Sequence, residues 1–346
     1  MKRILQLTAY WMMGICLAAC SHAHVEESDR IVIDLEKEVQ DSILFSSFVD
    51  SIAYIPLETK DECLIGKIRD VIISDSIVFV LKGEMDEVLL FDRAGRYLRK
   101  ISRRGSGPGE YTLIGQMFYN EKRQTLSVAS YKILEYDLWG NCLNEFQPSF
   151  YVSDLFQLDN GDYLLSRLER LDEPNSLLVL TDAKGNIKKE VLKRNPEYNI
   201  ETTHYWELFS WGDDVRFISP QVENIVYSYE NETLKPSLNF KVLPEIPSSF
   251  YSTQRGVPLL GEHYYRSVFR ESGKWVNMVF CTTEKIRTVL YNKEIGQSMV
   301  GEVFKNDMDD MEHLFFLSES KGNTFTNYVK AKNEEDNPWI QILYLK

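Results

Sequence analysis

The chain has 346 residues, of which 44% are hydrophobic and 12% aromatic, so it can bury a large core and is not a disordered or low-complexity chain. The formal net charge of −13 argues against nucleic acid as a partner, because binding to phosphates requires basic patches. Five cysteines in a chain of this length are too few for a disulfide scaffold.

Residues 1–19 have the pattern of a lipoprotein signal peptide. Lys2 and Arg3 form a basic start, and the mostly apolar stretch that follows is too short for an ordinary membrane span. The stretch ends in Leu17-Ala18-Ala19-Cys20, which resembles the lipobox of bacterial lipoproteins and implies that Cys20 is lipidated. The alternative is an ordinary signal peptide followed by a coincidental cysteine.

Residues 20–45 are predicted to be the lipidated cysteine and a polar tether, because residues 21–30 (SHAHVEESDR) show no apolar periodicity. A serine rather than an aspartate after Cys20, with Glu26 and Glu27 nearby, favours the outer membrane. We therefore expect a lipoprotein of the cell envelope that contacts the membrane through its lipid anchor. The sequence does not indicate which leaflet of the membrane carries the anchor, and exposure at the cell surface is one of the alternatives.

The rest of the chain repeats itself. Aspartates at positions 92, 137 and 182 are each followed three residues later by a glycine, so both residue types recur every 45 residues. Each copy has an apolar strand, a turn in which glycine supplies a positive φ, and a second strand. A period of 40–50 residues built from hairpins indicates the blades of a β-propeller.

Six first hairpins can be counted along the chain, and each is followed by a third apolar strand: they lie at 71–81, 117–129, 155–166, 208–219, 268–280 and 315–329. Five blades continue into a fourth strand, but the sixth cannot, because the chain ends at Lys346. The spare strand Ser51–Leu57 can fill that vacancy and close the ring. We predict an all-β, six-bladed β-propeller over residues 46–346, with four antiparallel strands in each blade.

The segment from Arg103 to Tyr111 (RRGSGPGEY) resembles the G-x-G-P-G-[EQ]-[YF] signature of NHL-like propellers. Together with the lipobox and Ile52–Glu58 (IAYIPLE), it makes the chain similar to the six-bladed β-propeller lipoproteins of Bacteroidetes, of the NHL-like or TolB-like kind. This resemblance covers about residues 45–346. The functions of related propellers range from protein and peptide binding to sugar-acid hydrolysis and glycan lysis, and the fold alone does not choose among them.

Candidate ligand-binding residues lie in the loops that join one blade to the next, since these loops share one face around the central channel. Aromatic rings beside arginines suit stacking on sugars or holding carboxylates. The alternative is that the aromatic residues start inner strands and pack between blades. The candidates are Arg103, Arg104, Glu110, Tyr111, Tyr205, Trp206, Tyr251, Arg255, Tyr264 and Tyr265.

Catalytic motifs are scarce. No G-x-S-x-G is present. His204, His263 and His313 lie in the long loops, and a histidine base beside an arginine could abstract a proton next to a uronate carboxylate. His204, His263 and Arg266 are therefore the first residues to test for catalysis, the alternative being that each histidine is a hydrogen-bonded structural residue.

We expect no metal or other cofactor. Calcium is a weaker alternative at the acidic run Asp307, Asp309, Asp310 and Glu312, which His313 follows, but the run lacks the ligand order of an EF-hand. The favoured function is a non-catalytic lipoprotein that binds a glycan, a peptide or an envelope protein through its loop-rich face. The alternative is a propeller enzyme, a lyase or hydrolase, acting on an acidic glycan or a sugar lactone.

Overall fold

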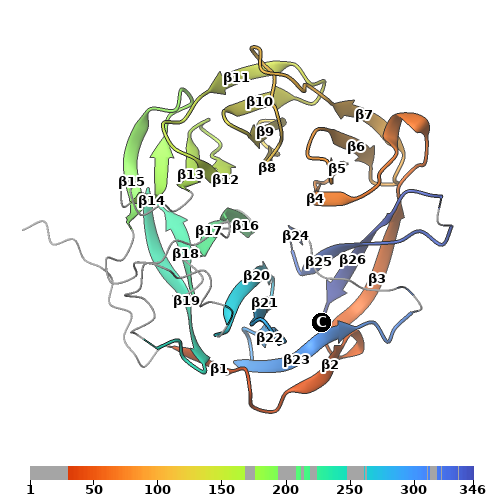
Figure 1. Cartoon of the computed structure of the whole chain (residues 1–346), viewed down its shortest axis with the longest axis vertical. Helices are drawn as coiled ribbons and strands as arrows, with labels where there is room; N and C mark the ends of the chain where they lie inside the picture. Colours follow the sequence, from red (N-terminus) through yellow and green to blue (C-terminus); the bar gives the residue numbers. More distant parts are fainter. Residues whose placement is uncertain are drawn as a thin grey trace, which may run out of the picture.

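The structure is a computed structural model that describes residues 30–167, 176–193, 208–211, 214–218, 224–247, 261, 263–309, 311, 318–320, 322–333 and 335–346. Within these residues the chain forms strands and two short 3-10 turns, Phe45–Ser47 and Asp61–Cys63. The strands make six sheets arranged in a ring, as Figure 1 shows. This confirms the predicted six-bladed β-propeller.

Each sheet is one blade, and the four strands of each blade are given below from the centre of the ring outwards (Figure 1). Blade 1 contains β4 (Ile68–Ile73), β5 (Ile77–Lys82), β6 (Val88–Asp92) and β7 (Tyr97–Ile101). Blade 2 contains β8 (Gln116–Asn120), β9 (Thr125–Ala129), β10 (Ile133–Asp137) and β11 (Cys142–Phe146). Blade 3 contains β12 (Val152–Gln157), β13 (Tyr163–Arg167), β14 (Ser176–Thr181) and β15 (Ile187–Lys193).

The second half of the ring follows the same order. Blade 4 contains β16 (Leu208–Trp211), β17 (Asp214–Ile218), β18 (Ile225–Glu230) and β19 (Thr233–Leu243). Blade 5 contains β20 (Tyr265–Ser272), β21 (Trp275–Cys281), β22 (Ile286–Asn292) and β23 (Gln297–Lys305). Blade 6 contains β24 (Ser318–Ser320), β25 (Thr324–Val329), β26 (Trp339–Leu345) and β3 (Val49–Pro56).

Blade 6 joins the two ends of the chain. Its outermost strand is β3, which pairs antiparallel with β26, with Ser51 opposite Tyr344 and Ile55 opposite Ile340. The N-terminal strand therefore closes the ring in the predicted way. Because β3 takes the vacant outer place, blade 6 is held by chain segments almost three hundred residues apart.

The range predicted to be tether, residues 20–45, includes two strands. Strands β1 (Ile31–Asp34) and β2 (Gln40–Leu44) lie inside the range expected to be tether, and they add a fifth, parallel strand to β19 and to β23. We call residues 30–48 the N-terminal strap. Its apolar residues are too few in each run to signal a blade strand, yet Ile33, Leu35 and Phe45 are fully buried.

The repeated aspartate forms the same turn in blades 1, 2 and 3. In each turn the carboxylate accepts the backbone N–H groups two and four residues later, and the glycine has a φ between 81° and 83°. The turns also touch the preceding blade. A Cβ at Gly95 would lie 1.9 Å from the carbonyl oxygen of Pro56, and one at Gly185 would lie 2.3 Å from the Phe146 ring.

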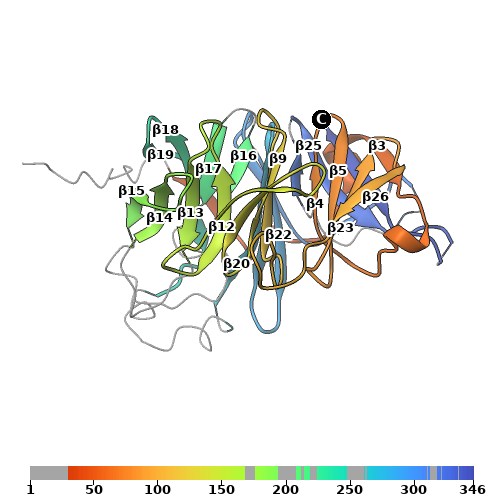
Figure 2. The same cartoon turned by 90° about the horizontal axis from the view of Figure 1, so that it is seen from above.

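Much of the core lies between neighbouring blades. Between blades 1 and 2, for example, Phe79, Leu90 and Leu126 belong to one continuous buried apolar cluster. Blades 4 and 5 share another cluster, to which Ile33 and Leu35 of the strap contribute. The loops between blades and those after each second strand leave on one side of the ring, the lower side in Figure 2, which we call the loop face.

Candidate functional site

Two loops of the loop face lie side by side over blades 1 and 2. The connection between β7 and β8 contacts the short loop between β9 and β10 at three places. The Tyr131 hydroxyl donates to the carbonyl of Ser106 at 3.3 Å, and the Lys132 ammonium donates to the carbonyl of Gly107 at 2.9 Å. The hydroxyls of Thr112 and Ser130 lie 3.4 Å apart. The two loops thus form one continuous surface.

Tyr111 belongs to the frame of this surface and not to its exposed side. It is fully buried, and its hydroxyl accepts the Arg103 N–H at 3.2 Å and lies 2.9 Å from the carbonyl oxygen of Asp86. Burial raises the pKa of this phenol to about 12. A side chain enclosed in this way cannot contact a ligand from solvent. The prediction that Tyr111 binds a ligand is therefore wrong. The glycine-rich spacing predicts a loop but does not say which side chain points inward.

Glu110 also stabilises the loop, because its carboxylate accepts the N–H of Gly107 at 2.9 Å. A Cβ at Gly105 would lie 2.0 Å from the same carboxylate, which explains the small residue at that position. Arg103 donates through Nε to the carbonyl of Gly140 at 3.0 Å, so it ties the loop to the turn of blade 2. Glu110 and Arg103 are therefore positioned by contacts within the protein.

Arg104 and three residues that sequence reasoning missed form the exposed side of this face. The Arg104 side chain is 66% exposed, and its guanidinium lies 3.8 Å from the Asp86 carboxylate. Leu113, Tyr131 and Tyr151 are large apolar side chains that are exposed in the neighbouring loops. We call these four residues the loop-face patch. In the sequence, only their positions between predicted strands indicate that Leu113, Tyr131 and Tyr151 could be exposed.

The second predicted group, from His263 to Arg266, has a different environment. Tyr264 is buried, and its hydroxyl donates to Glu36 of the strap at 2.6 Å. Arg266 is 5% exposed and donates to the side-chain oxygen of Asn224 in blade 4. His263 and Tyr265 are half-buried. Tyr264 and Arg266 therefore join blades 4 and 5 and the strap.

Glu36 is the centre of that contact. Its carboxylate also lies 3.0 Å from the Lys285 ammonium and 3.4 Å from the Arg287 guanidinium. The hydrogen bond from Tyr264 and the one from Lys285 lower the pKa of Glu36 to about 2. Burial and the same hydrogen bond raise the pKa of Tyr264 to about 12. Glu36, Tyr264, Lys285 and Arg287 together hold the strap against blade 5, and we call them the ionic clip.

The acidic run considered for calcium is used for structure in its described part. The Asp307 carboxylate accepts the backbone N–H of Ser46 at 2.9 Å and its hydroxyl at 2.5 Å. The Asp309 carboxylate accepts the Tyr54 hydroxyl at 2.7 Å and the Asn306 amide at 2.6 Å. In the described part of the chain, histidine, cysteine and acidic side chains form no group that could hold a metal ion.

Several predicted residues lie outside the described residues: His204, Tyr205, Trp206, Tyr251, Arg255, Asp310, Glu312, His313 and the lipidation site Cys20. In the parts of the chain that are described, no helix is long and apolar enough to cross a membrane.

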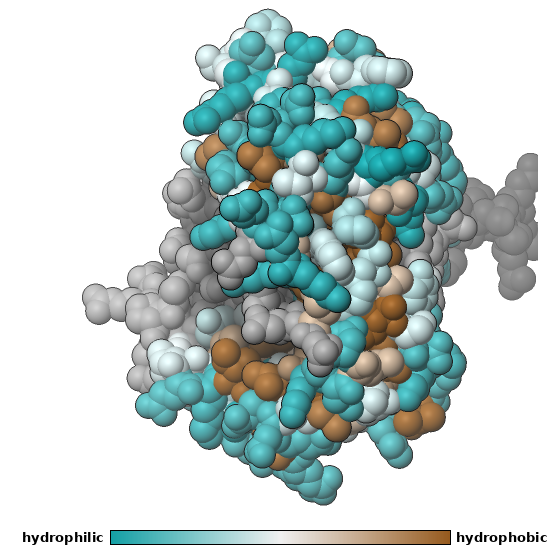
Figure 3. All heavy atoms as spheres, turned by 90° about the vertical axis from the view of Figure 1, so that its right-hand side faces the viewer, coloured by the Kyte–Doolittle hydropathy of each residue, from teal (hydrophilic) through white to brown (hydrophobic). Residues whose placement is uncertain are grey.

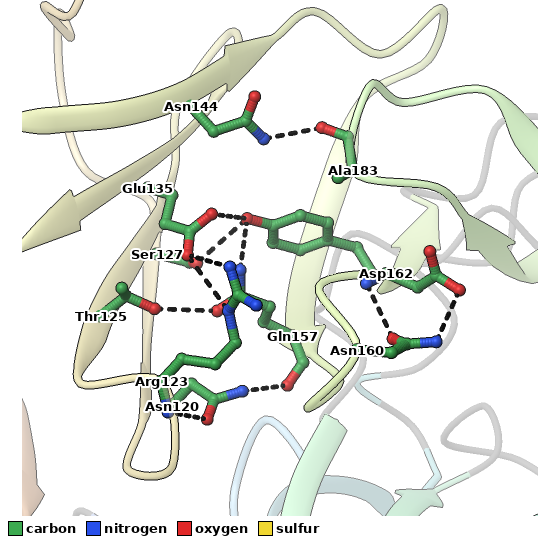
Figure 4. A network of polar contacts seen from close by, with 11 residues as sticks. Asn120, Arg123, Thr125, Ser127, Glu135, Asn144, Gln157, Asn160, Asp162 and Ala183 are labelled. Carbon is green, nitrogen blue, oxygen red and sulfur yellow. Dashed lines mark hydrogen bonds and ion pairs between the residues drawn. The ribbon is translucent and has the colours of Figure 1, made fainter.

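A buried polar network joins blades 2 and 3 (Figure 4). Glu135 is 4% exposed, and its carboxylate lies 3.1 Å from the Arg123 guanidinium and accepts the Tyr163 hydroxyl at 3.4 Å. The Gln157 amide donates to that hydroxyl at 2.9 Å and its oxygen accepts the Thr125 hydroxyl at 3.1 Å. Because the side chains satisfy one another inside the interface, the network stabilises the blade contact and does not form an accessible site.

A family model described as "Domain of unknown function (DUF4934)" matches residues 30–343. The chain belongs to this family. The match begins at the strap and so includes β1 and β2 with the six blades. No curated protein matches the chain.

Solved structures give the same fold. A "Putative exported protein" from Bacteroides fragilis is 19% identical, covers 91% of this chain and 99% of its own, and superposes with a TM-score of 0.74. A member of the DUF4221 family from Bacteroides vulgatus is 10% identical, covers 86% of this chain and 97% of its own, and has a TM-score of 0.53. At these identities the likeness concerns the fold alone.

Proposed function

We propose that this protein is a lipoprotein of the cell envelope, anchored through Cys20 in the outer membrane, whose propeller binds a glycan, a peptide or an envelope protein through its loop face without catalysis. The observation that carries this proposal is the loop-face patch. Arg104, Leu113, Tyr131 and Tyr151 are exposed on one side of the ring, where the loops between blades gather.

The patch has the composition of a binding surface. Exposed tyrosines offer a flat apolar ring with a polar tip, which suits stacking on a sugar or packing against a peptide. The Tyr131 ring is held by its hydrogen bond to Ser106, and the Lys132 ammonium lies 5.5 Å from the ring centre. A ring held in place before binding loses little conformational entropy when a ligand arrives.

The frame below the patch supports the same function. Tyr111 fills the space under the loop, and the Tyr136 hydroxyl donates to the carbonyl of Gly109 at 2.9 Å. Loops that carry binding residues work best on a rigid scaffold, and each of these contacts ties the loop to a blade strand. The enzyme alternative has no comparable support, since Arg266, one of its named residues, is committed to Asn224 inside a blade contact.

The proposed anchor also limits the reach of the propeller. Residues 21–29 separate Cys20 from the strap, and nine extended residues span roughly 30 Å at most. The rim of blade 4, where the strap begins, would therefore stay within about that distance of the membrane that carries the lipid. Export is supported by the lipobox, and one structural neighbour bears the name of an exported protein.

The test is thermal melting of residues 25–346 against a panel of glycans, uronates and peptides. A ligand at one hundred times its dissociation constant adds about 2.7 kcal/mol of apparent stability, which gives a readable shift in Tm. We expect Tyr131→Ala and Tyr151→Ala to abolish the shift. The matched control is Tyr344→Ala, because Tyr344 is as exposed as Tyr131 (42% each) but lies in the last strand, near the opposite face.

A ligand shift that survives both loop-face variants would contradict the loop face as the binding site. Turnover of any glycan or lactone in the panel would contradict the non-catalytic assignment.

A further inference from the structure

The outer edges of the six blades are protected to different degrees. An unpaired edge strand can pair with another chain, and proteins limit this with an additional strand, with charged residues or with proline. In blades 4 and 5 the edges are covered by β1 and β2. In blade 3, β15 carries Lys188, Lys189 and Lys193.

Blades 1 and 6 also carry protecting residues. The edge strand β7 contains Arg99 and Lys100, and β3 contains Asp50 and ends at Pro56. Figure 3 looks onto this side of the ring and shows mostly hydrophilic side chains with apolar ones scattered among them. Neither edge is an open apolar strand.

The edge of blade 2 has neither an additional strand nor a proline, and it carries a single charged residue. Strand β11 is the last strand of its sheet, and its residues are Cys-Leu-Asn-Glu-Phe. Its single charged residue, Glu145, is already bonded to the Lys132 ammonium at 2.8 Å and to the N–H of Gly109 at 2.7 Å. Leu143, in the bulge of this strand, is 56% exposed, whereas the equivalent bulge residue of blade 3 is Lys188.

Trp139 lies at the start of this edge and is 71% exposed. It occupies the third position of the repeated aspartate turn, where blade 1 has Ala94 and blade 3 has Lys184, so the turn itself does not require an aromatic ring. The Arg99 guanidinium lies 3.5 Å from the centre of the indole and donates to the carbonyl of Leu138 at 3.3 Å. Arg99 therefore holds the ring from one side.

We infer that the outer edge of blade 2 binds an extended segment of a partner protein, which adds a fifth strand to β11 and places an apolar side chain against Trp139 and Leu143. The chain itself shows this mode of addition, because β1 and β2 pair with the equivalent edges of blades 4 and 5 over four residues each. In strand addition the main-chain hydrogen bonds supply affinity and the side-chain contacts supply specificity. Tryptophan, tyrosine and arginine are enriched among the residues that carry most of the binding energy of protein interfaces.

A second copy of this chain is the competing occupant. Antiparallel pairing of two β11 strands centred on Leu143 would place the two Leu143 side chains opposite each other, so the test includes dimerisation as an outcome. An extended segment of a partner is the favoured occupant, because β2 already shows this mode of addition and buries Ile43. This inference rests on the blade 2 edge and is independent of the loop face.

The test uses residues 25–346 and a synthetic peptide that copies residues 39–46 (VQDSILFS), read by amide hydrogen exchange. The intact strap occupies the edges of blades 4 and 5 from within the same chain, so the peptide competes poorly there. We expect millimolar peptide to slow exchange in residues 142–146. Leu143→Lys and Trp139→Ala should each lower the apparent affinity at least tenfold, because they introduce the residue types that blades 3 and 1 carry at these positions.

Leu98→Lys is the matched control, since it makes the same change in the bulge of β7, and it should leave protection of residues 142–146 unchanged. Unchanged exchange at 142–146 in saturating peptide, or protection that appears on β7 or β15 instead, would overturn the proposal. So would concentration-dependent dimerisation that Leu143→Lys removes, because the edge would then take a second copy. Equal melting temperatures of the variants show that the fold is intact.

Discussion

Blades 1 to 3 and blades 4 and 5 fasten their outer strands in two different ways. In the first group, each outer strand donates a side-chain hydrogen bond to a turn of the next blade, which is the aspartate turn in blades 2 and 3 and the turn between β18 and β19 in blade 4. Arg99, Asn144 and Lys189 occupy the same place in three successive repeats, and each donates to a carbonyl in the following turn. In blades 4 and 5 the strap runs along the rim and pairs with both outer strands.

The difference shows that the outer strand of a blade can be held in place either by residues nearby in the sequence or by a distant segment of the chain. The aspartate turn is specified within five residues, so it can be repeated along the chain. The strap reaches its partners across more than two hundred residues, and it is held by buried apolar side chains together with the clip at Glu36 and the contact of Ser46 with Asp307. We therefore expect substitutions in the strap and substitutions in the turns to lower the free energy of unfolding by different amounts.

The largest effect should come from Phe45→Ala in the strap. Phe45 is fully buried, with its ring 5.7 Å from that of Phe48 and 6.3 Å from that of Phe304. Truncating a buried phenylalanine costs about 3–5 kcal/mol. Urea unfolding should show this loss, while Leu44→Ala at the neighbouring, exposed position should cost far less. Equal losses in the two variants would mean that burial of the strap contributes little.

Gly95→Ala should be the most damaging single change in the repeated turns. Both Gly95 and Gly296 have a positive φ, but only at Gly95 would the new Cβ meet backbone, the carbonyl oxygen of Pro56. We expect Gly95→Ala to lower the free energy of unfolding by about 1–3 kcal/mol more than Gly296→Ala, as overpacking does. If the two variants unfold at the same urea concentration, the turn does not press against the preceding blade.

A smaller effect is expected for Asp137→Ala. The Asp137 carboxylate accepts the N–H groups of Trp139 and Asn141 and the Asn141 amide, at 2.7 to 2.9 Å. Loss of these bonds in a solvent-accessible turn should cost about 1–2 kcal/mol of unfolding free energy. Asp159→Ala removes an exposed carboxylate paired only with Lys122 and should change stability by less than about 0.5 kcal/mol.

The smallest effect, and the one that depends on pH, is expected for Glu36→Gln. Because the folded pKa of Glu36 is lowered from 4.5 to about 2, its charge stabilises the fold above pH 4.5, and this contribution is lost as the pH falls towards 2. Glu36 is partly exposed, so the loss at pH 7 should be about 1 kcal/mol or less. The difference in Tm between wild type and variant should vanish near pH 2, and Glu38→Gln, an exposed neighbour, should show no such trend. A difference in Tm that stays constant between pH 7 and pH 2 would contradict the ionic clip.

The candidate site could be predicted only in part. The glycine-rich segment from Arg103 to Tyr111 correctly indicated a loop between two blades. Its spacing could not show that Tyr111 turns inward, or that Tyr131 and Tyr151 stay exposed, because burial depends on which strands pack beneath the loop. Arg266 and Tyr264 were named for binding, but their polar groups are taken by Asn224 and Glu36, residues far away in sequence.

The sequence by itself determined the repeat, the number of blades and the closure by β3, since turns every 45 residues and a count of strands are local properties. The tertiary structure alone decided the course of the strap. Runs as short as Ile31–Asp34 and Gln40–Leu44 carry no turn signal, and they form strands only because the parallel edges of β19 and β23 offer hydrogen bonds and a place to bury Ile33 and Ile43. Long-range pairing of this kind has no periodicity along the chain, so only the assembled ring shows it.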